Sequence, residues 1–175
     1  MKPLVAAAVA MLIALAAAPS PARAPEPTYD QTRDWVVRTL NDFTGYSRGD
    51  TAISYRDISM DSCQLRYTIS SVTGATYTDT DTFSVSLDSV KDVLWGTVND
   101  PPRAYVIFTT ATPITFNKRR VWTRPDHQSQ STTSPTTIGG LEFGKPGDNY
   151  ADIASKMKVA LVHAADLCKV QLAAK

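Results

Sequence analysis

Two stretches of the chain place apolar side chains at the three- and four-residue spacing of a helix. In the first, Thr28 and Gln31 form the pattern of a capping box, and Gly45 is a plausible stop. Its apolar positions are Tyr29, Val36, Leu40 and Phe43, widened by Trp35 and Val37. We therefore predict a helix from about Thr28 to Phe43.

The second helical stretch lies at the end of the chain, where Asp148 is a good N-terminal cap. One apolar stripe runs along it: Tyr150, Ile153, Met157, Ala160, Leu161, Ala164, Leu167 and Cys168. The charged residues Lys156, Lys158, Asp166 and Lys169 fall outside this stripe. A helix with one apolar face has to bury it, and the rest of the chain offers a sheet as its partner.

Between Thr51 and Phe116 the apolar period changes to two, which predicts short strands. Turn residues separate them, at Ser71–Gly74 and most strongly at Asn99–Pro102. The alternating residues are Ile53 and Tyr55, Ile58 and Met60, Cys63 to Ile69, Phe83 to Leu87, Val93 and Trp95, Tyr105 to Thr110, and Ile114 to Phe116. Val121-Trp122 and Ile138–Phe143 are expected to be further short strands. This pattern is typical of an antiparallel sheet with one face exposed to water.

Asp126 to Thr137 contains no large apolar residue and is dominated by Ser and Thr, so we predict a flexible polar loop at 126–137. The fold class is then α+β. We expect an N-terminal helix, a curled antiparallel sheet or partly open barrel of about six or seven strands, and a C-terminal amphipathic helix packed on the sheet.

The first residues have the pattern of a secretory signal peptide. Lys2 precedes an apolar run of 15 residues, Leu4 to Ala18, and small residues and prolines follow. This run is shorter than the roughly 20 residues of a membrane-spanning helix. Cleavage is expected after Ala22, or alternatively after Ala24, which leaves one domain, 23–175, in the periplasm or outside the cell. A retained membrane anchor is the alternative.

Loss of Lys2 with the signal peptide leaves 17 basic and 17 acidic residues. A neutral domain lacks the positive electrostatic field that attracts nucleic acids and anionic lipids. We therefore expect neither a nucleic-acid partner nor stable membrane insertion after the signal peptide is removed.

Cys63 and Cys168 are the only cysteines. Cys63 begins an alternating segment and Cys168 lies on the apolar stripe of the last helix, so both are expected to face one core. In an oxidising compartment this pair predicts a disulfide. A redox pair or half of a metal site is the alternative, which the absence of a CxxC motif and the presence of only two histidines disfavour.

The order of elements resembles the pleckstrin-homology superfold, and more narrowly a set of small exported bacterial proteins of unknown function. The residues that suggest it are Met60 to Leu65 in a strand, and Ile153 with Ala160 to Cys168 in the last helix. The resemblance implies a pleckstrin-homology-like fold and no particular activity.

No catalytic residue, metal ligand or cofactor site is predicted. Neither a nucleophile elbow, a zinc-binding helix nor a phosphate-binding glycine loop occurs. His163 is expected on the flank of the last helix, pairing with Asp166, and His127 in the polar loop. Asp79 and Asp81 would share one side of a strand, as an acid pair or a calcium site requires, or simply form the wet side of a hairpin arm.

The densest basic patch is Lys118, Arg119 and Arg120, with Arg124 close behind. It could bind a phosphate or a polysaccharide carboxylate, or it could be a solvated strand edge. Two functions remain. The first is a non-catalytic domain that binds an envelope protein or a small anionic ligand. The second is a small hydrolase of the periplasm or exterior with a scattered site, which the missing motifs disfavour.

Overall fold

The computed structural model of the chain describes residues 25–42, 45–99, 102–122, 127–144 and 149–174. The predicted signal peptide, its cleavage points, Arg124 and Asp148 lie outside the described residues. The elements in chain order are α1 (Tyr29–Asp42), β1 (Tyr46–Arg48), β2 (Thr51–Asp61), β3 (Gln64–Thr73), β4 (Tyr77–Ser86), a short 3₁₀ turn η1 (Leu87–Ser89), β5 (Val90–Asn99), β6 (Pro102–Trp122), β7 (Gln130–Phe143) and α2 (Tyr150–Ala173). The predicted α+β class is confirmed.

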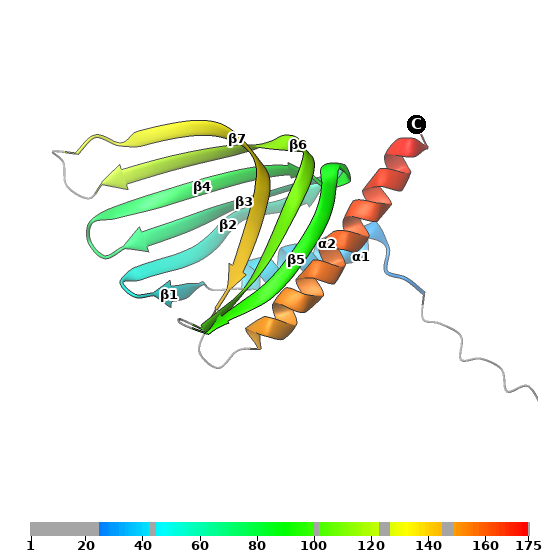
Figure 1. Ribbon diagram of the computed structural model, residues 1–175, viewed down its shortest axis with the longest axis horizontal. Helices are drawn as coiled ribbons and strands as arrows, with labels where there is room; N and C mark the ends of the chain where they lie inside the picture. Colours follow the sequence, from blue (N-terminus) through cyan, green and yellow to red (C-terminus); the bar gives the residue numbers. More distant parts are fainter. Residues whose placement is uncertain (1–24, 43–44, 100–101, 123–126, 145–148, 175) are drawn as a thin grey trace, which may run out of the picture.

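All seven strands form one antiparallel sheet in the order β1-β2-β3-β4-β6-β5, with β7 paired to β6. The long strand β6 joins two halves of this sheet. Its first part pairs with β5, its last part pairs with β4, and β7 follows it on both sides of a register shift between Thr109 and Ile114. Figure 1 shows the consequence: β5, β6 and β7 curve over α2, while β2, β3 and β4 have one end near the helices and extend away from them at the other.

The predicted loop at 126–137 is wrong for Gln130–Thr137, which belongs to β7. These residues pair with the end of β6, from Arg120↔Gln130 to Ile114↔Thr136. Backbone pairing with β6 holds this half of β7 in place, and most of its side chains are exposed. A strand of this kind has no apolar period, so its hydroxyl-rich composition resembles that of a loop.

The capping box predicted for α1 is present. The backbone N–H of Thr28 donates to Gln31 Oε1 at 2.9 Å, and the N–H of Gln31 donates to Thr28 Oγ1 at 3.3 Å. At the start of α2 the cap is Asn149, whose side-chain oxygen accepts from the N–H of Asp152 at 3.3 Å.

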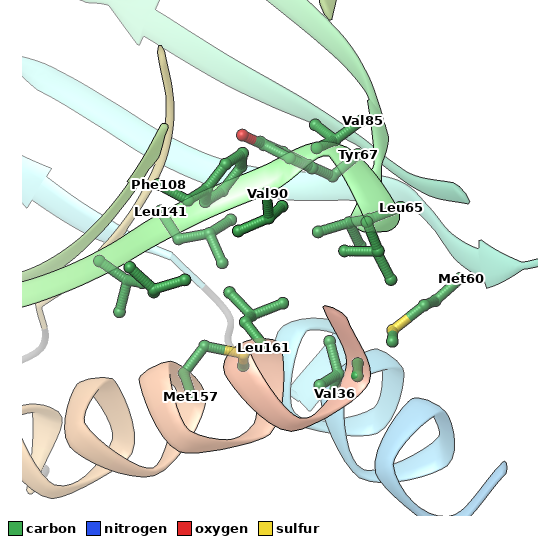
Figure 2. Packing of buried hydrophobic residues seen from close by; sticks show 14 of the residues in the cluster. Val36, Met60, Leu65, Tyr67, Val85, Val90, Phe108, Leu141, Met157 and Leu161 are labelled. Carbon is green, nitrogen blue, oxygen red and sulfur yellow. The ribbon is translucent and has the colours of Figure 1, made fainter. Parts of the chain in front are cut away.

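The core lies between the two helices and one face of the sheet. Figure 2 shows Met157 and Leu161 of α2 and Val36 of α1 pointing toward sheet residues that include Leu65 and Phe108. Each of these side chains is at most 2% exposed. Of the predicted apolar stripe of the last helix, Met157, Leu161, Ala164 and Cys168 are buried in this core. Tyr150, Ile153 and Ala160 are partly buried against it, and Leu167 is half-buried outside it.

Cys63 and Cys168 form the predicted disulfide, with Cα atoms 5.7 Å apart and a separation of 105 positions in sequence. Cys63 lies in the turn between β2 and β3 rather than at the start of a strand. Ser62 and Cys63 both have positive φ, 48° and 62°, as the two central residues of a type I′ hairpin require. The bond thus joins this hairpin to the last turns of α2.

Two tyrosine hydroxyls close the open edge of β7. Tyr67 on β3 donates to the carbonyl of Gly140 at 3.1 Å and accepts from its N–H at 3.3 Å. Tyr55 on β2 likewise donates to the carbonyl of Glu142 at 3.2 Å and accepts from the N–H of Glu142. We call these contacts the tyrosine latch. They pair backbone groups that an edge strand otherwise leaves open, and so they fold β7 against the inner face of β2 and β3.

Candidate functional site

The tyrosine latch forms part of the wall of a cleft of about 470 Å³. One side of the cleft is the inner face of β2 to β4, and the other is the face of β5 to β7 that points away from α2. The lining includes Ile53, Tyr55, Ile69, Ser71, Phe83, Val98, Arg103, Tyr105, Ile107, Gly140 and Glu142, with Arg48 at the end of β1. A volume of this order is typical of small-molecule sites, which combine apolar walls with a few placed polar groups.

The polar groups of the cleft gather around Glu142. The hydroxyl of Tyr46 donates to Glu142 Oε2, and Arg103 Nε lies 3.7 Å from the same oxygen. Burial raises the pKa of Tyr46, and the hydrogen bond to Glu142 raises it further, so this tyrosine remains a neutral donor. Arg48 is exposed and has no ion-pair partner among the residues described. With two guanidinium groups and one carboxylate, this end of the cleft is positively charged.

The apolar part of the cleft continues into a row of aromatic rings on the inner face. Tyr67 stacks on Phe83 and Phe83 on Phe116, each with ring centroids 4.9 Å apart. These rings lie directly opposite one another on β3, β4 and β6. Neighbouring strands therefore present one continuous apolar wall.

Beyond these rings the inner face becomes charged. Arg120 donates two hydrogen bonds to Asp79, at 2.6 and 2.7 Å, and Lys118 Nζ lies 3.3 Å from the same carboxylate. The Arg120 guanidinium also covers the ring of Tyr77, 4.2 Å from its centroid. Hydrogen bonding from Arg120 lowers the pKa of Asp79, and the charge of Lys118 lowers it further. In this cluster one carboxylate engages two cations, and an aromatic ring covers one of them.

Asp79 and Asp81 share one side of β4, as predicted, but they face inward and not toward open water. Asp79 is only 8% exposed. Asp81 Oδ1 is buried and has no hydrogen-bond partner among the described residues. Burial raises the pKa of the Asp81 carboxyl, against the opposing charge of Lys118. Asp81 pairs across the ladder with Ile69, which lines the cleft.

The four residues predicted to bind an anion do not form one patch. Lys118 and Arg120 point to the inner face and are engaged by Asp79. Arg119, between them on the strand, points to the outer face. Arg124 lies outside the described residues. The sequence did not indicate Arg48 and Arg103, because they lie 55 residues apart and share the cleft only through the contacts of Glu142 on β7 with Tyr46 on β1, Tyr55 on β2 and Arg103 on β6.

Neither histidine lies in the cleft. The predicted pairing of His163 with Asp166 is wrong. His163 Nε2 lies 2.6 Å from the carbonyl oxygen of Pro27, and Asp166 pairs with Lys169 at 3.5 Å. The path of the chain ahead of α1 brings that carbonyl to the helix flank. His127 is exposed and its ring lies 4.9 Å from that of Trp122.

A larger hollow of about 800 Å³ lies between α1 and α2, lined by Trp35, Val159 and His163 among others. Most of its lining area is apolar, although Glu26, Arg38 and Lys156 also border it, whereas the smaller cleft combines an apolar wall with Arg48, Arg103 and Glu142. The described ranges contain no group of three or more acidic, histidine or cysteine side chains placed to hold a metal ion. Within the same ranges, none of the helices has the length and hydropathy needed to span a membrane.

Comparison of the chain with protein-family models, with curated proteins and with solved structures finds no match. The resemblance to the pleckstrin-homology superfold therefore stays a prediction. Functional arguments for this protein rest on the geometry of its own residues.

The Asp79–Arg120 pair predicts a pH-dependent stability. Because the pKa of Asp79 is lowered in the folded state, the pair stabilises the fold above the ordinary carboxyl pKa of 3.8 and loses this effect as the pH falls through the lowered value. Asp79→Asn is expected to lower the free energy of unfolding by about 1 to 3 kcal/mol at neutral pH. Melting curves of both proteins from pH 7 downwards should converge at the acid end, and a constant difference would contradict this role.

Proposed function

We propose that this chain is an exported, non-catalytic binding domain whose cleft holds a small amphipathic molecule with an anionic head group. The observation that carries this proposal is the composition of the cleft, where the apolar side chains of Ile53, Ile69 and Phe83 lead to Arg48 and Arg103 at one end. An apolar tail would bury these side chains, and an anionic head would pair with the two guanidinium groups.

The charge of this end favours an anion over a cation. Glu142 is already engaged by the Tyr46 hydroxyl and by Arg103, while Arg48 is open to solvent. A carboxylate, sulfate or phosphate head could therefore accept hydrogen bonds from Arg48 without displacing an existing partner. A cationic head would meet two positive charges before it reached Glu142.

A binding role fits the side chains of the cleft better than hydrolysis does. Among the described residues that line the cleft, Ser71 is the one with an aliphatic hydroxyl, and none is a histidine. Nucleophilic catalysis requires a base within hydrogen-bond reach of the nucleophile. The tyrosine hydroxyls Tyr46 and Tyr55 are occupied by hydrogen bonds to Glu142.

Export is supported by the apolar run near the N-terminus and by the disulfide. Bonds of this kind persist in the periplasm and outside the cell and are rare in the reducing cytosol. The paired cysteines leave no free thiol in the described chain.

The proposal is tested with dodecanoate and dodecyltrimethylammonium, which share an apolar tail and differ in the charge of the head. Isothermal titration should show tighter binding of dodecanoate. Arg48→Gln with Arg103→Gln should weaken the binding of dodecanoate by at least about tenfold, because charge-assisted hydrogen bonds of about 1.5 to 3 kcal/mol are lost and 1.4 kcal/mol already corresponds to tenfold.

Two neighbouring residues of β3 provide a matched pair for the position of the ligand. Ser71→Trp places a large side chain in the cleft and should abolish binding of dodecanoate. Val72→Trp places the same side chain on the opposite, exposed face, where Val72 is 40% exposed, and should leave binding unchanged. Equal binding of both amphiphiles, or full binding by Ser71→Trp, would overturn the proposal.

A further inference from the structure

The outer face of the sheet, on the side away from the cleft, carries a separate and distinctive surface. On β4 the segment Thr78-Asp79-Thr80-Asp81-Thr82 alternates, so that both carboxylates point inward and all three threonines point outward. The same alternation holds on the strands beside it. The outward residues are Arg66, Thr68, Ser70 and Val72 on β3, Thr78, Thr80, Thr82 and Ser84 on β4, Thr115, Asn117, Arg119 and Val121 on β6, and Ser131, Thr133 and Pro135 on β7. We call this the hydroxyl face.

Positive charge on the hydroxyl face is not neutralised by carboxylates of the same strands. None of its outward positions on β3, β4, β6 or β7 is Asp or Glu. Arg66 and Arg119 are exposed and have no hydrogen bond or ion pair within the described chain. They differ in this from Lys118 and Arg120, which Asp79 engages on the inner side.

A third arginine lies flat on the same face. Arg56 on β2 reaches across β3 and donates to Thr80 Oγ1 at 3.1 Å, while its Nε lies 3.9 Å from Asp57 at the edge. Thr68 and Ser70 of β3 are buried, at 3% and 6% exposure, although they point to the outside. Neighbouring strands are joined by side-chain hydrogen bonds on this face, between Thr68 and Thr82 at 3.2 Å and from the Thr133 hydroxyl to the amide oxygen of Asn117 at 2.8 Å.

We infer that the hydroxyl face binds an acidic polysaccharide. Such a polymer presents hydroxyl groups along its length with anionic groups at intervals, and this face offers the complementary set of hydroxyls, an amide and separated guanidinium groups. Arg66 lies in register with Thr115, two strands away across β4, and Arg119 is four residues further along β6. With ordinary strand spacings this places the two arginine Cα atoms about 16 Å apart. That spacing suits an extended chain with sparse charges lying across several strands.

Nucleic acid fits the hydroxyl face less well. A duplex carries one charge for about every 1.7 Å of its axis, and its binding proteins concentrate basic residues to match. Single strands are bound on exposed aromatic rings, and no outward position of this face is aromatic. The chain as a whole carries a net charge of only +1, which gives it little long-range attraction for such a polymer.

The test is affinity electrophoresis of the folded protein through gels that contain polygalacturonate, neutral dextran or no polymer. Polygalacturonate should retard the protein and dextran should not. Arg66→Gln with Arg119→Gln should raise the apparent dissociation constant for polygalacturonate, obtained from the retardation, at least tenfold. The matched control, Arg38→Gln with Lys91→Gln, removes the same charge from exposed positions on α1 and β5 and should behave as the unaltered protein.

Melting curves establish that both double variants fold. An equal loss in the two variants would reduce the effect to net charge and overturn the inference, as would absence of retardation at low salt. Tighter binding of a 20-base-pair DNA duplex than of polygalacturonate would assign the face to nucleic acid instead. Because the hydroxyl face and the cleft lie on opposite sides of β3, saturating dodecanoate should leave the retardation unchanged. Each proposal can therefore fail without the other.

Discussion

Replacing both cysteines by alanine is expected to destabilise the fold more than any other change considered for this protein. The disulfide connects positions 105 residues apart, Cys63 in the β2–β3 hairpin and Cys168 in α2. In the chain-entropy model, a closed loop of about 100 residues is stabilised by about 4.7 kcal/mol. For a domain of this size that corresponds to a fall in melting temperature of about 10 °C or more.

Thermal unfolding followed by circular dichroism measures this effect. Alanine is preferred to serine at position 168, because Cys168 is fully buried and a hydroxyl there would add a separate cost. The unaltered protein in reductant should approach the melting temperature of the double variant, and the double variant should not respond to reductant. Equal melting temperatures of the oxidised and reduced protein would mean that the bond does not stabilise the fold.

The elements that sequence predicts best are those whose signal is local. The reciprocal hydrogen bonds of Thr28 and Gln31 follow from two residue types three positions apart, and the buried face of α2 follows from a helical period. The disulfide was also predictable, because both cysteines occupy positions that a simple pattern places on the core side. The two helix features depend on few long-range contacts. The disulfide links positions 105 residues apart, but only two cysteines are available to form it.

Strand boundaries were harder to predict, for a physical reason. The segments around Tyr105, Ile114 and Val121 are parts of one strand, β6, because the register shift between Thr109 and Ile114 bends the strand without ending it. The first half of β7 was missed because pairing with β6, and not burial of apolar side chains, holds it in place. Neither pairing nor a bulge leaves a clear apolar period in sequence.

The candidate sites depend on contacts between distant segments. Alternation along β6 could have shown that Arg119 faces away from Lys118 and Arg120. Nothing local could have shown that Asp79 engages those two residues, or that Arg48 and Arg103 share a cleft. The cleft exists because β7 turns back on β2 and β3, and Tyr55 meets Glu142 across 87 residues of sequence.

The tyrosine latch leads to the second large expected effect. In Tyr55→Phe with Tyr67→Phe, the rings remain and only two hydroxyls are lost, so the backbone groups of Gly140 and Glu142 on that edge lose their partners. Burial raises the pKa of both tyrosines, which keeps each hydroxyl protonated and able to donate and accept at once. An unsatisfied buried polar group costs about 1 to 3 kcal/mol, and water from the cleft can replace part of the loss. We therefore expect the double variant to be less stable by about 3 kcal/mol.

Tyr105→Phe is the matched control, because Tyr105 lines the same cleft and its hydroxyl makes no hydrogen bond within the described residues. Its free energy of unfolding in urea should change by less than about 0.5 kcal/mol. Amide hydrogen exchange separates loss of the latch from general destabilisation. In the double variant the N–H groups of Gly140 and Glu142 should exchange much faster, while those of α2 change only with global stability. If these two amides stay as protected as before, β7 is held by its ladder with β6 alone, and the tyrosines only line the cleft.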